Sequence, residues 1–137
     1  MGRSSVKIIA DTNILVRAVI RDDAKQSRAA IQMLREAELI AVPLPVLCEF
    51  AWVLRRVYSL SVAEISAAIE TLIGSKNVTV NRVAVEAGLD VLQHGGDFAD
   101  GLIAFEGRWL GGETFVSCDK QAVTLIASQG QPVRLLS

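Results

Sequence analysis

The sequence has few cysteine, histidine and aromatic residues. Its 137 residues include two cysteines, one histidine, four Phe, two Trp and one Tyr. A zinc site would have to gather Cys48, Cys118 and His94, which lack the close pairwise spacing of zinc motifs. Both cysteines stand in apolar stretches, which predicts buried, reduced thiols and a cytoplasmic protein. His94 stands near a helix end, where a histidine commonly interacts with the helix dipole.

An excess of positive charge is also missing. The chain has 14 Lys and Arg against 15 Asp and Glu, a formal net charge of −1. A polyanion would therefore have to be bound through a local patch or a metal ion. Motifs for a serine hydrolase elbow, a P-loop or a dinucleotide fold are absent as well.

No segment of the sequence is predicted to enter a membrane. The apolar residues after Val6 are interrupted by Lys7 and Asp11, so no signal peptide is expected. The longest apolar run, residues 39–54, contains two prolines and Glu49 and is shorter than the roughly 20 residues that span a bilayer. We expect a protein without membrane contact.

The length of the chain predicts one domain, residues 1–137, with a single core. A hydrophobic share of 51% is high for such a domain, which favours an oligomer or a bound protein partner. The helical segments 24–37 and 45–73 are the expected apolar contact surfaces.

Short β-branched runs alternate with segments of helical periodicity. Strands are expected at residues 6–10, 39–42, 78–80, 114–117 and 132–136, the first of them buried. Helices are expected at residues 13–20, 24–37, 45–57, 62–73, 82–93, 97–110 and 120–128. This alternation predicts an α/β fold with a parallel sheet.

Acidic residues follow the predicted strands and begin the predicted helices. Asp11 and Asp119 come after strands, at the sheet edge where open α/β folds bind ligands. Asp97 and Asp100 lie on one turn at the start of a helix. A purely structural interpretation stays open, because an aspartate at a helix start commonly caps it, and Asp100 suits a capping box with Asp97.

Glu49 has no such structural explanation. It lies in the apolar stretch LPVLCEFAWVL, residues 44–54, where we expect it to be buried and to need a compensating partner. A divalent cation shared with the aspartates would supply that partner. Carboxylate clusters suit Mg²⁺ or Mn²⁺, and such ions activate water for phosphodiester hydrolysis.

Four elements together resemble a known family: ADTN at residues 10–13, the glutamate in VLCEF, DFADGLIA at 97–104 and SCD at 117–119. The set resembles the PIN-domain family, most closely the VapC toxins of type II toxin–antitoxin systems. The resemblance implies a three-layer α/β/α sandwich with a central parallel sheet. It also implies a Mg²⁺- or Mn²⁺-dependent endoribonuclease, usually a homodimer, that cleaves RNA and is inhibited by a VapB-like antitoxin.

The resemblance also implies which residues form the site. The catalytic and metal-binding set is Asp11, Glu49, Asp100 and Asp119, and the accessory positions are Asp97, Thr12, Asn13 and Ser117. Two departures concern the shape of the substrate site: Cys118 stands where an aromatic is common, and Gly101 replaces a frequent alanine.

Contact with RNA is expected from local cations. Arg17 and Lys120 are the preferred candidates, followed by Arg21, Arg55 and Arg56, although each of them also suits a solvated surface. The few aromatic residues spell out no stacking surface for bases.

Two other functions compete with the nuclease. A PIN-fold protein without toxin activity, serving as a binding module, would tolerate loss of Glu49. A phosphoacceptor domain would use Asp11 and Lys120, but the strand at 39–42 leads into Pro43 where such a domain needs an aspartate.

Overall fold

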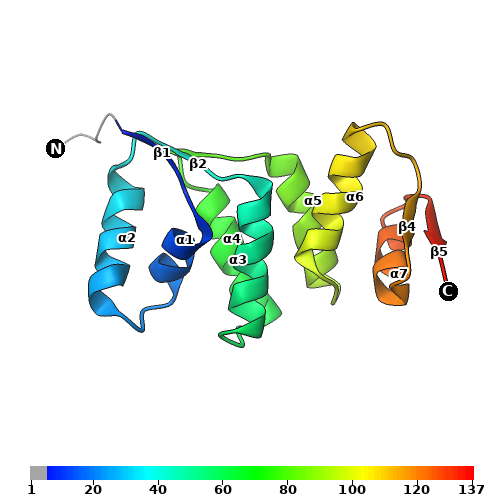
Figure 1. The fold of residues 1–137 in the computed structure, drawn as a ribbon, viewed down its shortest axis with the longest axis horizontal. Helices are drawn as coiled ribbons and strands as arrows, with labels where there is room; N and C mark the ends of the chain where they lie inside the picture. The colour runs from blue at the N-terminus through cyan, green and yellow to red at the C-terminus, as the bar shows by residue number, and fades with distance from the viewer. Residues whose placement is uncertain (1–5) are drawn as a thin grey trace. The chain divides into compact units, whose positions relative to one another are not determined.

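The computed structural model describes residues 6–137. They form two compact units, the first ending at Asn81 and the second spanning Arg82–Ser137. Figure 1 shows the elements of both, coloured from blue to red along the chain.

The first unit contains a three-stranded parallel sheet. Its strands are β1 (Lys7–Ile9), β2 (Leu39–Ala41) and β3 (Val78–Thr79), in the order β1-β2-β3. Ile40 of β2 is in register with Ile8 on one side and Val78 on the other. The helices of this unit are α1 (Thr12–Val19), α2 (Ala24–Glu36), α3 (Leu44–Arg56) and α4 (Val62–Ile73).

The core of the first unit comes from one face of each helix. On α3 the buried residues are Leu47, Phe50, Ala51 and Leu54, which recur at the three- and four-residue spacing of one helix face. Helix α4 begins at a capping box: the Glu64 amide donates to the Ser61 hydroxyl, and the Ser61 amide donates to the Glu64 carboxylate. Local sequence thus fixes where this helix starts.

The second unit contains α5 (Arg82–Gln93), α6 (Phe98–Trp109), β4 (Phe115–Ser117), α7 (Lys120–Ser128) and β5 (Val133–Leu135). Strands β4 and β5 pair in parallel, with Val116 opposite Arg134. A buried cluster of Val91, Ala104 and Ile126 joins α5, α6 and α7, and Phe115 and Val133 pack against it. The unit therefore has a core of its own.

The predicted elements are confirmed, with ends that shift by one to a few residues. Every predicted strand forms, and all strand pairs among residues 6–137 are parallel. The hydrogen bonds divide the strands into one sheet per unit. The predicted burial of the first strand is wrong: β1 is an edge strand of its sheet, and Ile9 is 79% exposed.

The burial of the two cysteines differs from the prediction. Neither forms a disulfide, as predicted, but Cys118 is exposed and Cys48 is only half-buried, so the prediction of two buried thiols is wrong. Cys118 lies in the turn after β4, outside the apolar strand that suggested its burial. Among residues 6–137, no helix combines the length and the apolar character that crossing a membrane requires.

Candidate active site

Asp11 lies one residue beyond the buried Ala10, at the carboxyl end of β1, and caps helix α1. The Thr12 amide donates to Oδ1 of Asp11 at 2.8 Å, and the side chain of Asp11 is otherwise exposed. The cap therefore fixes the position of the carboxylate while solvent can reach it. Both interpretations of Asp11, cap and ligand, remain compatible with this geometry.

The two polar residues after Asp11 differ in environment. Thr12 is only 4% exposed, and its hydroxyl oxygen has no hydrogen-bond partner among the described residues. A buried hydroxyl without a partner costs about 1–3 kcal/mol, so such groups commonly serve a ligand or water. Asn13, in contrast, is exposed on the first turn of α1. Of the two, Thr12 is the one whose chemistry the fold leaves unsatisfied.

Glu49 lies on the solvent side of α3, so the prediction of its burial is wrong. The residues two before and one after it, Leu47 and Phe50, are fully buried, whereas Glu49 is exposed. Successive helical residues point about 100° apart, so an apolar neighbourhood in the sequence does not imply an apolar environment in the fold. Glu49 carries no burial penalty, and its role as a ligand stays a prediction.

Asp97 and Asp100 occupy the first turn of α6 without forming a cap. Asp97 has the extended backbone of an N-cap residue, yet its side chain makes no capping hydrogen bond. The Asp100 amide bonds only to the carbonyl oxygen of Asp97, at 3.1 Å. The pair Ser61 and Glu64 shows what a formed capping box looks like in this protein. The structural explanation of the Asp97 and Asp100 side chains as a capping box is therefore wrong.

The surroundings of Asp100 raise its pKa. Burial of its half-buried side chain raises the pKa of Asp100 above 3.8, and the negative charges of Asp97 and then Asp119 raise this pKa further. Both the burial and the two neighbouring carboxylates disfavour the charged form. The second unit thus brings Asp97 and Asp119 within electrostatic reach of Asp100.

Asp119 lies beyond the carboxyl end of β4 and caps α7. Its Oδ1 accepts hydrogen bonds from the amides of Gln121 at 3.0 Å and Ala122 at 3.2 Å. The Asp119 amide donates to the hydroxyl oxygen of Ser117 at 3.0 Å. Ser117 therefore holds the turn that presents Asp119, and its accessory role in the site stays a prediction.

The acidic residues suit a hard divalent cation by their donor atoms. The charges of Asp97 and Asp119 raise the pKa of Asp100, so there is negative charge near Asp100 to neutralise, and carboxylate oxygens are the ligands that Mg²⁺ and Mn²⁺ prefer. Within neither unit do the described residues place three acidic, cysteine or histidine side chains at coordinating distances. Asp11 and Glu49 belong to the first unit, and the joint role of the four carboxylates stays a prediction.

The two preferred cations differ in how available they are. Arg17 forms an ion pair with Asp22 and lines a pocket of about 560 Å³ between α1 and α2, together with Asn13 and Met33. Lys120 is exposed at the first position of α7, beside Asp119, and forms no ion pair with residues 6–137. Lys120 is therefore the better placed of the two for a phosphate.

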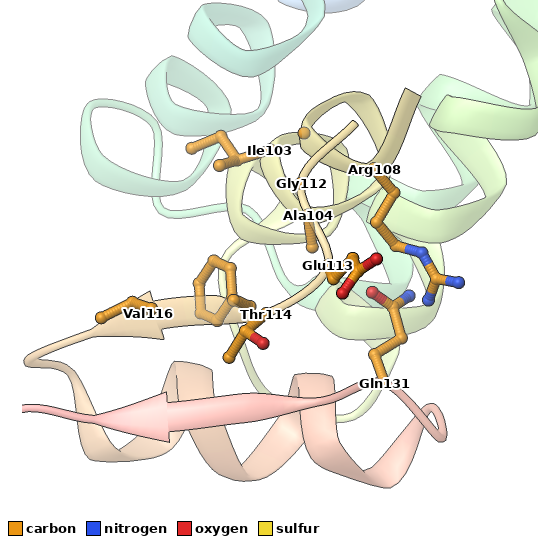
Figure 2. A pocket seen from close by; sticks show the side chains of 10 residues that line it. Ile103, Ala104, Arg108, Gly112, Glu113, Thr114, Val116 and Gln131 are labelled. Carbon is orange, nitrogen blue, oxygen red and sulfur yellow. The ribbon is translucent and has the colours of Figure 1, made fainter. Parts of the chain in front are cut away.

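A pocket of the second unit lies apart from the predicted site residues. It has a volume of about 340 Å³ and is lined by α6, by the loop after it and by β4 (Figure 2). Arg108, Glu113 and Gln131 give it polar groups, and Ile103 and Val116 give it apolar ones. None of the predicted site residues lines it.

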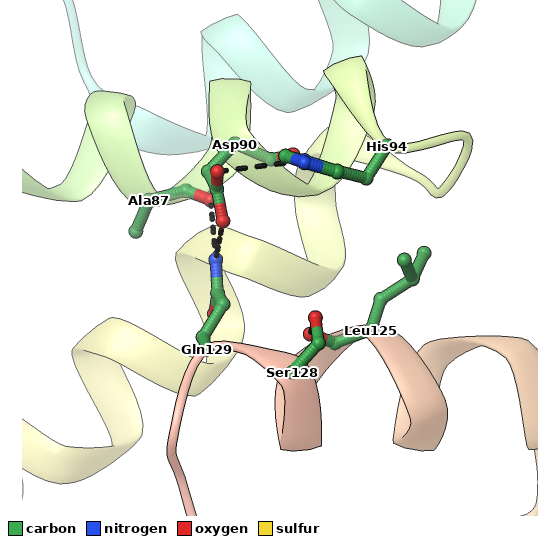
Figure 3. Close-up of polar contacts among 6 residues, drawn as sticks. All are labelled: Ala87, Asp90, His94, Leu125, Ser128 and Gln129. Atoms are coloured by element: carbon green, nitrogen blue, oxygen red, sulfur yellow. Dashed lines mark hydrogen bonds and ion pairs between the residues drawn. The ribbon is translucent and has the colours of Figure 1, made fainter.

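His94 has a structural role at the end of α5. Its Nδ1 lies 2.7 Å from the carbonyl oxygen of Asp90, which can only accept, so Nδ1 carries the hydrogen (Figure 3). The same Asp90 accepts a hydrogen bond from Gln129 at 2.7 Å through its carboxylate. The expectation that His94 interacts with the helix end is confirmed.

The packing of α6 against α5 requires a glycine at position 101, which the sequence alone did not indicate. A Cβ atom there would lie 2.3 Å from the carbonyl oxygen of Ala87 and 2.6 Å from Cα of Gly88. The glycine thus lets the first turns of α6, which carry Asp100, approach the backbone of α5. The replacement of the family's frequent alanine by Gly101 therefore concerns the packing of these helices as well as the shape of the substrate site.

Comparison with known proteins supports the family resemblance and the fold. The family model described as PIN domain matches residues 8–123, through both units and most of the chain. No curated protein sequence matches the chain significantly. PIN domains are generally nucleases, commonly metal-dependent, on a three-layer α/β/α fold with a parallel sheet, which confirms the predicted fold class. The chain belongs to the PIN-domain family.

Proposed function

We propose that this protein is an endoribonuclease that binds Mg²⁺ or Mn²⁺ through Asp11, Glu49, Asp100 and Asp119. One observation carries the proposal: Asp97 and Asp100 begin a helix, yet neither side chain caps it, and Asp100 is half-buried beside two further carboxylates. Repulsion of this kind lowers stability and has no structural benefit. A bound cation removes it, which explains why the residues are there.

The chain's own residues would contribute position and charge. The caps at α1 and α7 fix Asp11 and Asp119 through backbone amides. The unsatisfied hydroxyl of Thr12 offers a donor or an acceptor next to Asp11, and Lys120 offers a cation for a phosphate beside Asp119. When bound, the metal ion would lower the pKa of an attacking water and stabilise charge on the leaving oxygen.

The biological role that suits this activity is that of a cytoplasmic VapC-type toxin, a homodimer inhibited by a VapB-like antitoxin. The resemblance of the four sequence elements supports the toxin. The pocket between α1 and α2, with Ile14, Ala29 and the 49% exposed Met33, offers apolar surface on one of the segments expected to contact a partner. An antitoxin helix commonly docks in an apolar groove of this kind.

The test compares the wild-type chain with Asp100→Asn and with the matched control Glu86→Gln. Glu86 is exposed on α5 of the same unit and lies outside the acidic set. Loss of even an outer-shell partner costs about 10–100-fold in metal-site activity, so loss of a ligand should reduce RNA cleavage at least about a hundredfold. The assay measures cleavage of single-stranded RNA in the presence of Mg²⁺ or Mn²⁺, and the same reaction in EDTA is the blank.

The toxin role has a separate test. Expression of the wild-type chain should arrest growth, and expression of Asp11→Asn should not. Equal growth arrest by both chains, or no metal-dependent cleavage by the wild type, would contradict the proposal. A binding module without nuclease activity would instead show no cleavage and no stabilisation by Mn²⁺.

A further inference from the structure

Helix α3 has two opposite faces. Leu47, Phe50, Ala51 and Leu54 are buried in the core of the first unit. The exposed face consists of Pro45, Glu49, Trp52, Arg55 and Arg56. The predicted ligand Glu49 therefore shares its side of the helix with an aromatic residue and two cations.

Trp52 is 59% exposed on this face. Its large ring gains free energy when a partner removes it from water, so an exposed tryptophan can contribute to binding. A single exposed aromatic residue does not by itself indicate a function, but Trp52 has charged residues beside it on the same face of α3. The charged neighbours indicate which kind of partner would suit the ring.

The spacing places three side chains in a row along the helix. Trp52 follows Glu49 by three residues and precedes Arg56 by four, which are the two separations at which helical side chains are neighbours, with Cβ atoms about 5–6 Å apart. The ring thus lies between the carboxylate and the guanidinium. The base, ribose and phosphate of one nucleotide could follow this row.

The two arginines add local positive charge. Neither Arg55 nor Arg56 forms an ion pair with any residue in 6–137, unlike Arg17, which pairs with Asp22. Their position in the last turn of α3 also complements the helix dipole. The exposed face of α3 carries two positive charges and one negative charge in a chain whose formal net charge is −1. This face complements a polyanion.

We propose that Trp52 stacks on an unpaired base of single-stranded RNA and that Arg56 binds a phosphate of the same strand, next to Glu49. The inference rests on the proposed function and names the part of the substrate that this side of the site would hold. Unpaired bases stack on aromatic rings without regard to sequence, and arginine binds the backbone beside them. The proposal departs from the expectation that the few aromatic residues offer no stacking surface, and the experiment below decides between the two.

Tryptophan fluorescence tests the proposal because the chain has two tryptophans, Trp52 and Trp109. Trp109 is 77% exposed on α6, so either ring can be replaced with little effect on the fold. The Trp109→Phe variant reports on Trp52 alone, and Trp52→Phe is the matched control. The probe is a single-stranded RNA of about ten nucleotides, within the usual range for one binding site, added in EDTA so that no cleavage occurs.

We expect the RNA to quench the emission of Trp109→Phe and to leave that of Trp52→Phe unchanged. An aromatic ring that stacks on a base contributes to binding, so Trp52→Ala should weaken binding about 5- to 160-fold. In cleavage assays the same change should raise KM by a similar factor and leave kcat nearly unchanged. Arg56→Gln should reduce the salt dependence of binding, and Arg28→Gln on α2 should not.

Two outcomes would overturn the proposal. Emission that depends on protein concentration and not on RNA would identify the face as an interface between copies. Equal RNA response in both variants, or none, would remove Trp52 from the substrate site even if cleavage occurs. RNA-dependent quenching of Trp52 without cleavage in Mg²⁺ or Mn²⁺ would keep the RNA-binding face and contradict the nuclease, so the two failures are distinguishable.

Discussion

The carbonyl oxygen of Ala87 and a Cβ atom on Gly101 would lie 2.3 Å apart, a separation that real Cβ atoms do not reach. The obstacle is backbone of α5, which cannot rotate away as a side chain can. This contact sets how closely the first turns of α6 approach α5, and therefore where Asp100 lies within the second unit.

Replacement of Gly101 by alanine should lower the free energy of unfolding by about 1–3 kcal/mol, the usual cost of forcing extra volume into a packed contact. Gly107 on the same helix is the matched control, because nothing lies within 4 Å of a Cβ atom there. Gly107→Ala should raise stability by about 0.5–1 kcal/mol through helix propensity. Urea unfolding of both variants measures the difference, and equal effects of the two changes would refute the close approach.

A second prediction concerns the two helix starts with similar sequence patterns. Ser61→Ala breaks a formed capping box and should cost about 1 kcal/mol. Asp97→Ala removes a side chain that caps nothing and relieves repulsion on Asp100, so stability should change by less than about 0.5 kcal/mol. Thermal unfolding in EDTA compares them. A loss at Asp97 as large as that at Ser61 would show that Asp97 is a cap after all.

Much of the fold could be predicted from the sequence because its signals are local. The caps by Asp11, Ser61 and Asp119 join a side chain to an amide one to three residues away, so the sequence alone indicates where those helices begin. Strand pairing followed from the alternation of strands and helices. The caps depend on no distant contact, and the alternation of strands and helices is visible along the sequence.

The candidate site residues could be chosen from the sequence by residue type, but their environment could not be predicted. The burial of Glu49 was wrong because residues adjacent in a helix point to different sides, and only the packed fold shows which side faces solvent. The failure of Asp97 to cap depends on side-chain orientation within the acidic cluster. The contact between Gly101 and Ala87 joins two helices, and no local sequence pattern predicts it.

A third prediction is a pH dependence of stability caused by Asp100. Its folded-state pKa is raised above 3.8, so the folded state binds the proton more tightly than the unfolded state does. The stabilising contribution of the protonated form is complete below the unfolded pKa and is lost as the pH rises through the folded pKa. In EDTA, Asp100→Asn should therefore have a higher Tm than the wild type at neutral pH.

The advantage of Asp100→Asn should shrink as the pH falls toward 3.8, where the wild-type carboxyl group is also neutral. Thermal unfolding of both proteins across this range checks the prediction, with Glu86→Gln as the control for a general loss of one charge. A difference in Tm that stays constant with pH would show that the charge of Asp100 is not its cause.

The fourth prediction separates stability from metal binding at Glu49. Because Glu49 is exposed, Glu49→Gln should change the free energy of unfolding in EDTA by no more than about 0.5 kcal/mol. A ligand that binds only the folded state stabilises it by about 2.7 kcal/mol at a hundred times its Kd, so Mn²⁺ should raise the Tm of the wild type. If Glu49 is a ligand, the same Mn²⁺ concentration should raise the Tm of Glu49→Gln much less, and cleavage should be lost.

The matched control is Glu70→Gln, which replaces an exposed glutamate on α4 of the same unit and should behave as the wild type. Equal Mn²⁺ responses of Glu49→Gln and the wild type would remove Glu49 from the ligand set and leave the three aspartates to bind the ion.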